Sequence, residues 1–118
     1  MISCQRFIQP LLENYVTRLI EIYGSHIKSI ILYGSYTQGD YTEDSDIDIM
    51  TLLDISDIEI KKYRHQFSGM TYDFNTDYDL DIKSIAKIEK HLKKWLPVYP
   101  FYSKIEKEGI YLYQADSK

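Results

Sequence analysis

Two short apolar segments, joined by a glycine–serine turn and a polar stretch, constrain the fold of this chain more than any other feature. The first segment, 28–33, runs into Gly34 and Ser35, and the second begins on Asp46 and Asp48. Alternate residues of a strand face the same side of a sheet, so the two carboxylates project together. Neighbouring carboxylates repel each other unless a cation lies between them, and Mg²⁺ is a common partner. The sequence therefore predicts a metal site at the start of the second strand.

The glycine–serine turn adds a phosphate-binding element to this prediction. Glycine allows the backbone to approach a ligand closely. Amide groups at the start of a following helix point their donors at an anion. We therefore expect Gly34 and Ser35 to bind the phosphates of a nucleotide, with a brief helical turn after Ser35 that Gly39 and Asp40 interrupt.

Two other motifs with similar composition do not fit. Asp44, Asp46 and Asp48 match the first ligand positions of a calcium-binding EF-hand loop. The sixth position is Ile49 rather than glycine, however, and the twelfth is Ile55 rather than glutamate. A Walker A loop needs Gly-Lys-Ser/Thr, and no lysine follows the glycines of this segment.

Length, charge and cysteine content restrict the class of protein. With 118 residues, the chain is expected to form a single domain over 1–118. A net charge of −4 argues against a broad basic surface for nucleic acid, but it suits a site where a metal reverses the local charge. The chain has no apolar run of membrane-spanning length, no signal-peptide pattern and a single cysteine, Cys4. We therefore expect a cytoplasmic protein.

Hydrophobic periodicity predicts an α/β domain in which helices pack against a small sheet. Gly24 is expected to end the first helix after Tyr23, and Ser56 with Glu59 forms the capping box of a later one. The expected elements are a helix at 9–23, strands at 28–33 and 46–53, a helix from 56 to between 69 and 75, a strand opening at 77–82, helices at 85–96 and 100–108, and an extended piece at 110–113. Periodicity leaves strand order and direction open.

The glycine–serine turn and the Asp-x-Asp strand together resemble the signature of the nucleotidyltransferase superfamily that includes DNA polymerase β and the antibiotic adenylyltransferases. Gly39 and Ser45 also fall where this family usually has glycine and serine, and 108–113 resembles its terminal segment. The chain is most similar to the smallest branch, the minimal nucleotidyltransferases (MNT), which are often antitoxins of HEPN-domain toxins. This resemblance spans nearly the whole chain and implies a mixed sheet of the polymerase-β type flanked by helices.

The resemblance also implies a two-metal mechanism, with ATP as substrate and two Mg²⁺ ions as cofactors. Asp46 and Asp48 would bind the metals, with Asp46 as the bridging ligand. In the family, a third carboxylate comes from the strand after the Asp-x-Asp strand. Asp79 and Asp81 are the candidates here, since alternation places both on one face of the expected strand. Both are candidate catalytic residues, and Asp81 is also a candidate metal ligand. The sequence does not decide which of the two is the third ligand.

The activity that the resemblance implies is transfer of AMP from ATP to a tyrosine hydroxyl of a partner HEPN toxin, which silences the toxin. The expected partners are a nucleoside triphosphate and this toxin, with no membrane and no extensive nucleic-acid surface. Two alternatives stay open: an antitoxin that acts by binding alone, and a small-molecule adenylyltransferase of the antibiotic type. The preferred base, the acceptor and the oligomeric state, including a homo-oligomer, are not readable from the sequence.

Overall fold

The computed structural model describes residues 2–34 and 46–115, with side chains described from residue 8 onward. Its elements in chain order are α1 (Ile2–Tyr23), the 3₁₀ helix η1 (Gly24–His26), β1 (Ile27–Tyr33), β2 (Ile47–Leu53), α3 (Asp57–Lys62), α4 (Arg64–Tyr78), β3 (Ile82–Ile88), α5 (Glu89–Trp95), α6 (Pro100–Glu108) and β4 (Ile110–Gln114). Within the described ranges, no helix combines the length and the apolar character needed to cross a membrane.

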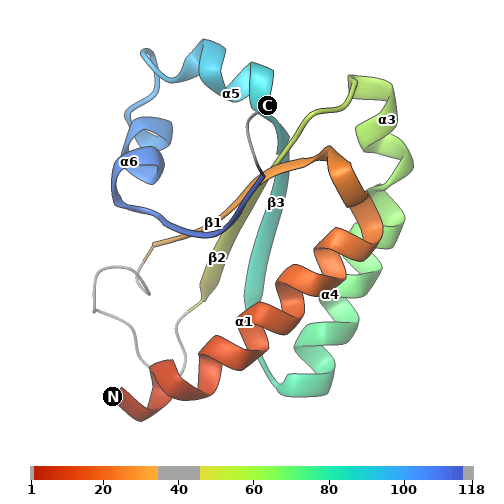
Figure 1. The fold of residues 1–118 in the computed structure, drawn as a ribbon, viewed down its shortest axis with the longest axis vertical. Helices are drawn as coiled ribbons and strands as arrows, with labels where there is room; N and C mark the ends of the chain where they lie inside the picture. The colour runs from red at the N-terminus through yellow and green to blue at the C-terminus, as the bar shows by residue number, and fades with distance from the viewer. Residues whose placement is uncertain (1, 35–45, 116–118) are drawn as a thin grey trace.

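The four strands form one mixed sheet in the order β3-β2-β1-β4 (Figure 1). β1 is antiparallel to both β2 and β4. β2 and β3 are parallel, with Ile47 opposite Ile82 and Leu53 opposite Ile88. Parallel neighbours need a crossover connection, and α3 and α4 provide it. The predicted α/β fold with a mixed sheet and flanking helices is therefore confirmed.

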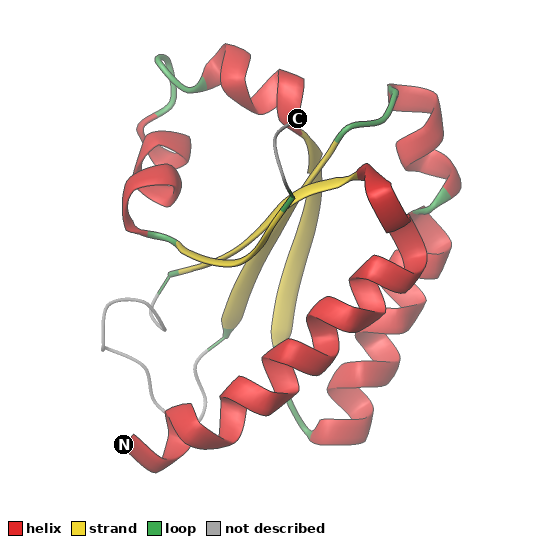
Figure 2. Ribbon diagram, viewed as in Figure 1, coloured by secondary structure: helices red, strands yellow, loops and turns green. Residues whose placement is uncertain are grey.

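Helices cover both faces of the sheet, so the central strands are buried on each side (Figure 2). α1 and α4 lie on one face, where Tyr15 and Leu19 belong to the larger core. Ile105 of α6 belongs to a smaller core on the opposite face, together with Met50 and Leu52 of β2. Because side chains alternate along a strand, Asp48 faces the same side as Met50. The predicted metal site therefore lies on the face that carries α6.

The local signals for helix boundaries are largely confirmed. The Ser56 hydroxyl accepts a hydrogen bond from the Glu59 amide at 3.1 Å, and the Glu59 carboxylate accepts one from the Ser56 amide at 3.3 Å. Pro100 begins α6, and Gly109 follows its last residue. The helix expected from residue 56 is instead two helices, α3 and α4, separated at Tyr63.

The segment around β3 corrects two sequence predictions. Residues 77–81 were expected to open the strand, but α4 runs to Tyr78 and the strand begins only at Ile82. Residues 85–88 were expected to be helical, but they continue the strand, because all of β3 pairs with the buried strand β2. Isoleucines three residues apart fit helical spacing locally, whereas pairing with a strand distant in sequence decides the structure. The helical turn expected after Ser35 lies outside the described residues.

Candidate functional site

Asp46 and Asp48 lie at the end of the sheet where β2 begins. Asp46 directly precedes the strand, and Asp48 stands opposite Tyr33 of β1 and Lys83 of β3. Both aspartates keep partial exposure to solvent. The geometry thus places two carboxylates at the start of a rigid central strand, where a ligand can reach them.

Gly34 lies directly against the Asp48 carboxylate. Its φ of +84° is in the region that favours glycine, and a Cβ built on it would clash with Asp48 Oδ2 and lie 3.3 Å from Asp48 Cγ. Glycine is therefore favoured by the backbone conformation of the turn, and a larger residue here would also have to move the Asp48 carboxylate. Ser35, the other predicted nucleotide-binding residue, lies outside the described residues.

The parallel register of β2 and β3 brings Asp81 beside Asp46. The Ile47 amide donates a hydrogen bond to the Asp81 carbonyl at 3.0 Å, one position before the first register pair of the two strands. The Asp81 side chain is near enough to Asp46 for the two carboxyl groups to interact, and this interaction raises the pKa of Asp81. We call Asp46, Asp48 and Asp81 the carboxylate cluster.

Asp79 occupies a different position. It is the C-cap residue of α4, with left-handed φ and ψ of 55° and 49°, and its amide bonds back to the Asn75 carbonyl. It does not lie on β3, so the expectation that alternation along a strand places it on one face with Asp81 is wrong. Its physical role in the structure is to end a helix, a position that asparagine and aspartate tolerate better than most residues.

Mutual repulsion is visible in the electrostatics of the cluster. Burial raises the pKa of Asp48, and the neighbouring charges of Asp46 and Asp81 raise it further. The pKa of Asp81 is raised first by the interaction of its side chain with Asp46, with burial and the Asp46 charge adding to the effect. Lys83 acts in the opposite direction on both groups. A cation bound beside Asp48 and Asp81 would reduce this repulsion and favour the ionised form of both carboxylates.

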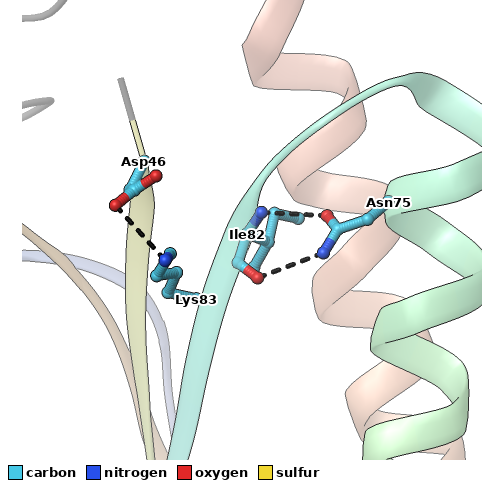
Figure 3. A network of polar contacts seen from close by, with 4 residues as sticks. All are labelled: Asp46, Asn75, Ile82 and Lys83. Atoms are coloured by element: carbon cyan, nitrogen blue, oxygen red, sulfur yellow. Dashed lines mark hydrogen bonds and ion pairs between the residues drawn. The ribbon is translucent and has the colours of Figure 1, made fainter. Parts of the chain in front are cut away.

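The sequence prediction missed Lys83, which contacts the cluster, and Asn75, which holds the first residue of β3. Lys83 Nζ lies 3.7 Å from Asp46 Oδ2, across the gap between β2 and β3 (Figure 3). Asn75 reaches from α4 to β3, where its side-chain oxygen accepts a bond from the Ile82 amide at 2.9 Å and its nitrogen donates to the Ile82 carbonyl at 3.2 Å. Alternation from Asp81 could have identified Lys83, but no local signal points to Asn75.

The donor chemistry of the cluster fits Mg²⁺, which prefers carboxylate oxygens. Within residues 2–34 and 46–115, no three or more His, Cys, Asp or Glu side chains converge closely enough to hold an ion as they stand. The cluster instead already attracts one cationic group, the Lys83 ammonium. The residues therefore suit a divalent cation, and its binding requires the side chains to draw together.

Comparison with known proteins identifies the family. Residues 12–114 match the family model described as "Nucleotidyltransferase domain". The chain therefore belongs to the nucleotidyltransferase domain family, and the resemblance drawn from the sequence is confirmed at this level.

Two curated relatives come from Methanocaldococcus jannaschii. "Putative protein adenylyltransferase MJ0604" is 47% identical over 47 residues, which are 40% of this chain and 47% of the relative. This match therefore spans about half the length of that protein. "Putative protein adenylyltransferase MJ1379" is 39% identical over 74 residues, 56% of this chain and 74% of the relative.

One solved structure, described as "toxin-antitoxin with AMP-PNP", contains a chain of similar fold. It is 20% identical in sequence with a TM-score of 0.51, and the alignment covers 88% of this chain and 74% of that chain. At this identity the likeness concerns the fold. It agrees with the mixed sheet and flanking helices described above.

Proposed function

We propose that this protein is a metal-dependent adenylyltransferase that transfers AMP from ATP to a tyrosine hydroxyl of a partner HEPN-domain toxin, and so acts as its antitoxin. The observation that carries the proposal is the gathering of Asp46, Asp48 and Asp81 at one end of the sheet, with Gly34 packed against Asp48. In a chain of the nucleotidyltransferase family, these groups have the chemistry that nucleotidyl transfer needs.

Each group has a distinct part in this reaction. The carboxylate cluster would hold two Mg²⁺ ions, which, when bound, neutralise phosphate charge and make the acceptor hydroxyl a better nucleophile. The backbone at Gly34, with Ser35, would bind the β- and γ-phosphates. The acceptor oxygen forms a bond to the α-phosphorus, the bond to the bridging oxygen breaks, pyrophosphate leaves, and the hydroxyl proton passes to solvent. Rigid placement by β2 and β3 supplies the orientation.

The relatives support the choice of acceptor class. Two of them are named as protein adenylyltransferases, and the structure of similar fold is a toxin–antitoxin complex with an ATP analogue. A macromolecular acceptor also suits a site at the open end of a sheet, because such an acceptor brings its own binding surface. We further propose that residues 1–118 act as one domain and that the reaction takes place in the cytoplasm.

The direct test is incorporation of AMP into a partner protein. The protein is mixed with the HEPN-domain toxin encoded beside it, ATP and Mg²⁺, and intact mass spectrometry follows the toxin. We expect its mass to rise by one or more adenylyl units, and the Asp46→Asn variant to abolish the change. A different result would indicate an antitoxin that acts by binding alone: the toxin would keep its mass even with the unaltered protein, and Asp46→Asn would still protect against the toxin.

A second pair of variants tests the third carboxylate. We propose that Asp81 is the ligand and that Asp79 serves only to end α4. Asp81→Asn should then reduce AMP transfer by a factor of 100 or more, on the order of the loss expected for a group that stabilises transferring charge. Asp79→Asn should retain most of the activity, since asparagine also adopts the left-handed conformation. The reverse pattern would rule out this assignment.

A further inference from the structure

Lys83 is placed in the candidate site by the register of the sheet. It stands opposite Asp48 on β2 and two residues after Asp81, so it faces the same side as both carboxylates. Its ammonium group is 3.7 Å from Asp46 Oδ2, and its side chain remains 59% exposed. One lysine thus lies within the electrostatic reach of the whole carboxylate cluster.

A lysine in this position has two consequences for a metal. Its positive charge offsets part of the repulsion within the cluster, and it lowers the pKa of both Asp48 and Asp81. It also repels an incoming divalent cation, because both cations compete for Asp46. The ammonium is mobile on a four-carbon stem and largely solvated, so it can exchange one anionic partner for another at little cost.

The nucleotide offers Lys83 such a partner. In the row that crosses the sheet, Tyr33, Asp48 and Lys83 are neighbours, and Gly34 follows Tyr33. The Gly34 backbone lies against the Asp48 carboxylate, so phosphates bound at this turn would lie near the face that Lys83 occupies. A negatively charged phosphate oxygen can replace the Asp46 carboxylate as its counter-ion.

We propose that Lys83 is the resident counter-cation of the carboxylate cluster, which a divalent cation must displace from Asp46 and which then binds a phosphate oxygen of the nucleotide. This inference rests on the proposed function and assigns a further residue to the same site. It follows that metal alone binds weakly, and that metal and nucleotide favour each other's binding through this side chain.

The first test measures metal binding without nucleotide. Mn²⁺ is titrated into the protein, and free Mn²⁺ is followed by electron paramagnetic resonance. Lys83→Met keeps the length of the side chain and removes its charge, so we expect about three- to tenfold tighter binding, as the loss of a partly screened charge near the metal implies. Lys83→Arg should stay close to the unaltered protein. Lys87→Met is the matched control, since Lys87 is exposed on the same strand but pairs with Leu52.

The second test measures nucleotide binding without metal. A non-hydrolysable ATP analogue is titrated in the presence of EDTA, and we expect Lys83→Met to weaken its binding about three- to tenfold, whereas Lys87→Met should not. Equal Mn²⁺ affinity in Lys83→Met and the unaltered protein would overturn the role of counter-cation. Tighter Mn²⁺ binding with unchanged nucleotide affinity would overturn the phosphate contact.

These outcomes are separable from failure of the proposed function. If the unaltered protein binds neither Mn²⁺ nor nucleotide, the proposed nucleotidyltransferase activity fails, and the inference about Lys83 fails with it. If both ligands bind and Lys83→Met changes neither affinity, the proposed function stands and the inference alone is wrong. Circular dichroism of each variant verifies that the fold is retained.

Discussion

Gly24 and Gly34 both have positive φ, +59° and +84°, but their surroundings differ. A Cβ on Gly24 would meet nothing within 4 Å, whereas a Cβ on Gly34 would clash with the Asp48 carboxylate. Gly24 is thus glycine for its backbone conformation alone. Gly34 is glycine for its conformation and for the proximity of a charged side chain, which links the turn directly to the candidate site.

This difference yields a paired prediction. Gly34→Ala and Gly24→Ala should each lower the free energy of unfolding by about 1–3 kcal/mol through backbone strain. Gly34→Ala should in addition displace Asp48 and weaken Mn²⁺ binding, which Gly24→Ala should leave unchanged. Urea unfolding and Mn²⁺ titration measure the two effects. Unaltered metal affinity in Gly34→Ala would show that the contact between Gly34 and Asp48 does not control the position of this carboxylate in the metal site.

Tyr23 predicts a dependence of stability on alkaline pH. Burial, with smaller contributions from Tyr15 and Tyr63, raises the pKa of the Tyr23 phenol from 10.0 to about 12. Because the folded-state pKa lies above the unfolded one, the stabilisation is complete below pH 10.0 and is lost as pH rises towards about 12. Between these values, Tyr23→Phe should lose stability less steeply in urea unfolding than the unaltered protein. Tyr72→Phe, at an exposed position, serves as control, and equal slopes in Tyr23→Phe and the unaltered protein would contradict the prediction.

At the scale of elements, the connection between α4 and β3 decides where the third carboxylate lies. The side chain of Asn75 pairs with both backbone groups of Ile82, as a neighbouring strand would (Figure 3). Its own carbonyl accepts a bond from the Leu80 amide at 3.0 Å. Asn75 therefore holds both Leu80, in the turn after α4, and Ile82, the first residue of β3. Asp81 lies between these two residues in the chain.

Asn75 should therefore affect both stability and metal binding. Asn75→Ala removes two hydrogen bonds and leaves Ile82 without these partners, so we expect a loss of about 1–3 kcal/mol in the free energy of unfolding. Mn²⁺ binding should weaken as well, because Asp81 is no longer held beside Asp46. Thr76→Ala is the control, since Thr76 is exposed and bonds only to the Tyr72 carbonyl within α4 among the hydrogen bonds described. Lower stability with full metal affinity would show that Asn75 supports the fold but does not position the site.

At the scale of the whole molecule, the two faces of the sheet have unequal roles. The larger core lies under α1 and α4, and the smaller core under α5 and α6. The carboxylate cluster lies on the side of the smaller core, at the end of the strands. The face with more buried apolar surface therefore supplies most of the stability, while the other face carries the candidate chemistry.

Core substitutions should reflect this asymmetry. Leu19→Ala, at a fully buried position, should lower the free energy of unfolding by about 2–5 kcal/mol, because it leaves a cavity beneath the sheet. Ile20→Ala, at the next residue and 36% exposed, should cost less than about 1 kcal/mol. Chemical denaturation of both variants measures the difference. Similar losses of unfolding free energy for Leu19→Ala and Ile20→Ala would mean that α1 does not pack its Leu19 face against the larger core.

Local sequence determined the features that depend on near neighbours. The capping box of Ser56, the end of α1 before Gly24, and the strand that begins after Asp46 and carries Asp48 all follow from patterns a few residues long. Their hydrogen bonds or side-chain directions are set locally. The motif that indicated the family is also a local pattern of this kind. The match over residues 12–114 confirms the family.

The tertiary structure alone decided the features that depend on distant pairing. Because β3 pairs in parallel with β2, residues 85–88 form a strand rather than the expected helix, and Asp81 and Lys83 lie beside Asp46 and Asp48. Asp79 lies outside this pairing, at the end of α4. No local pattern specifies which strand a segment will pair with. Hydrogen bonds between segments far apart in sequence form only when the whole chain is packed, and those bonds define the candidate site.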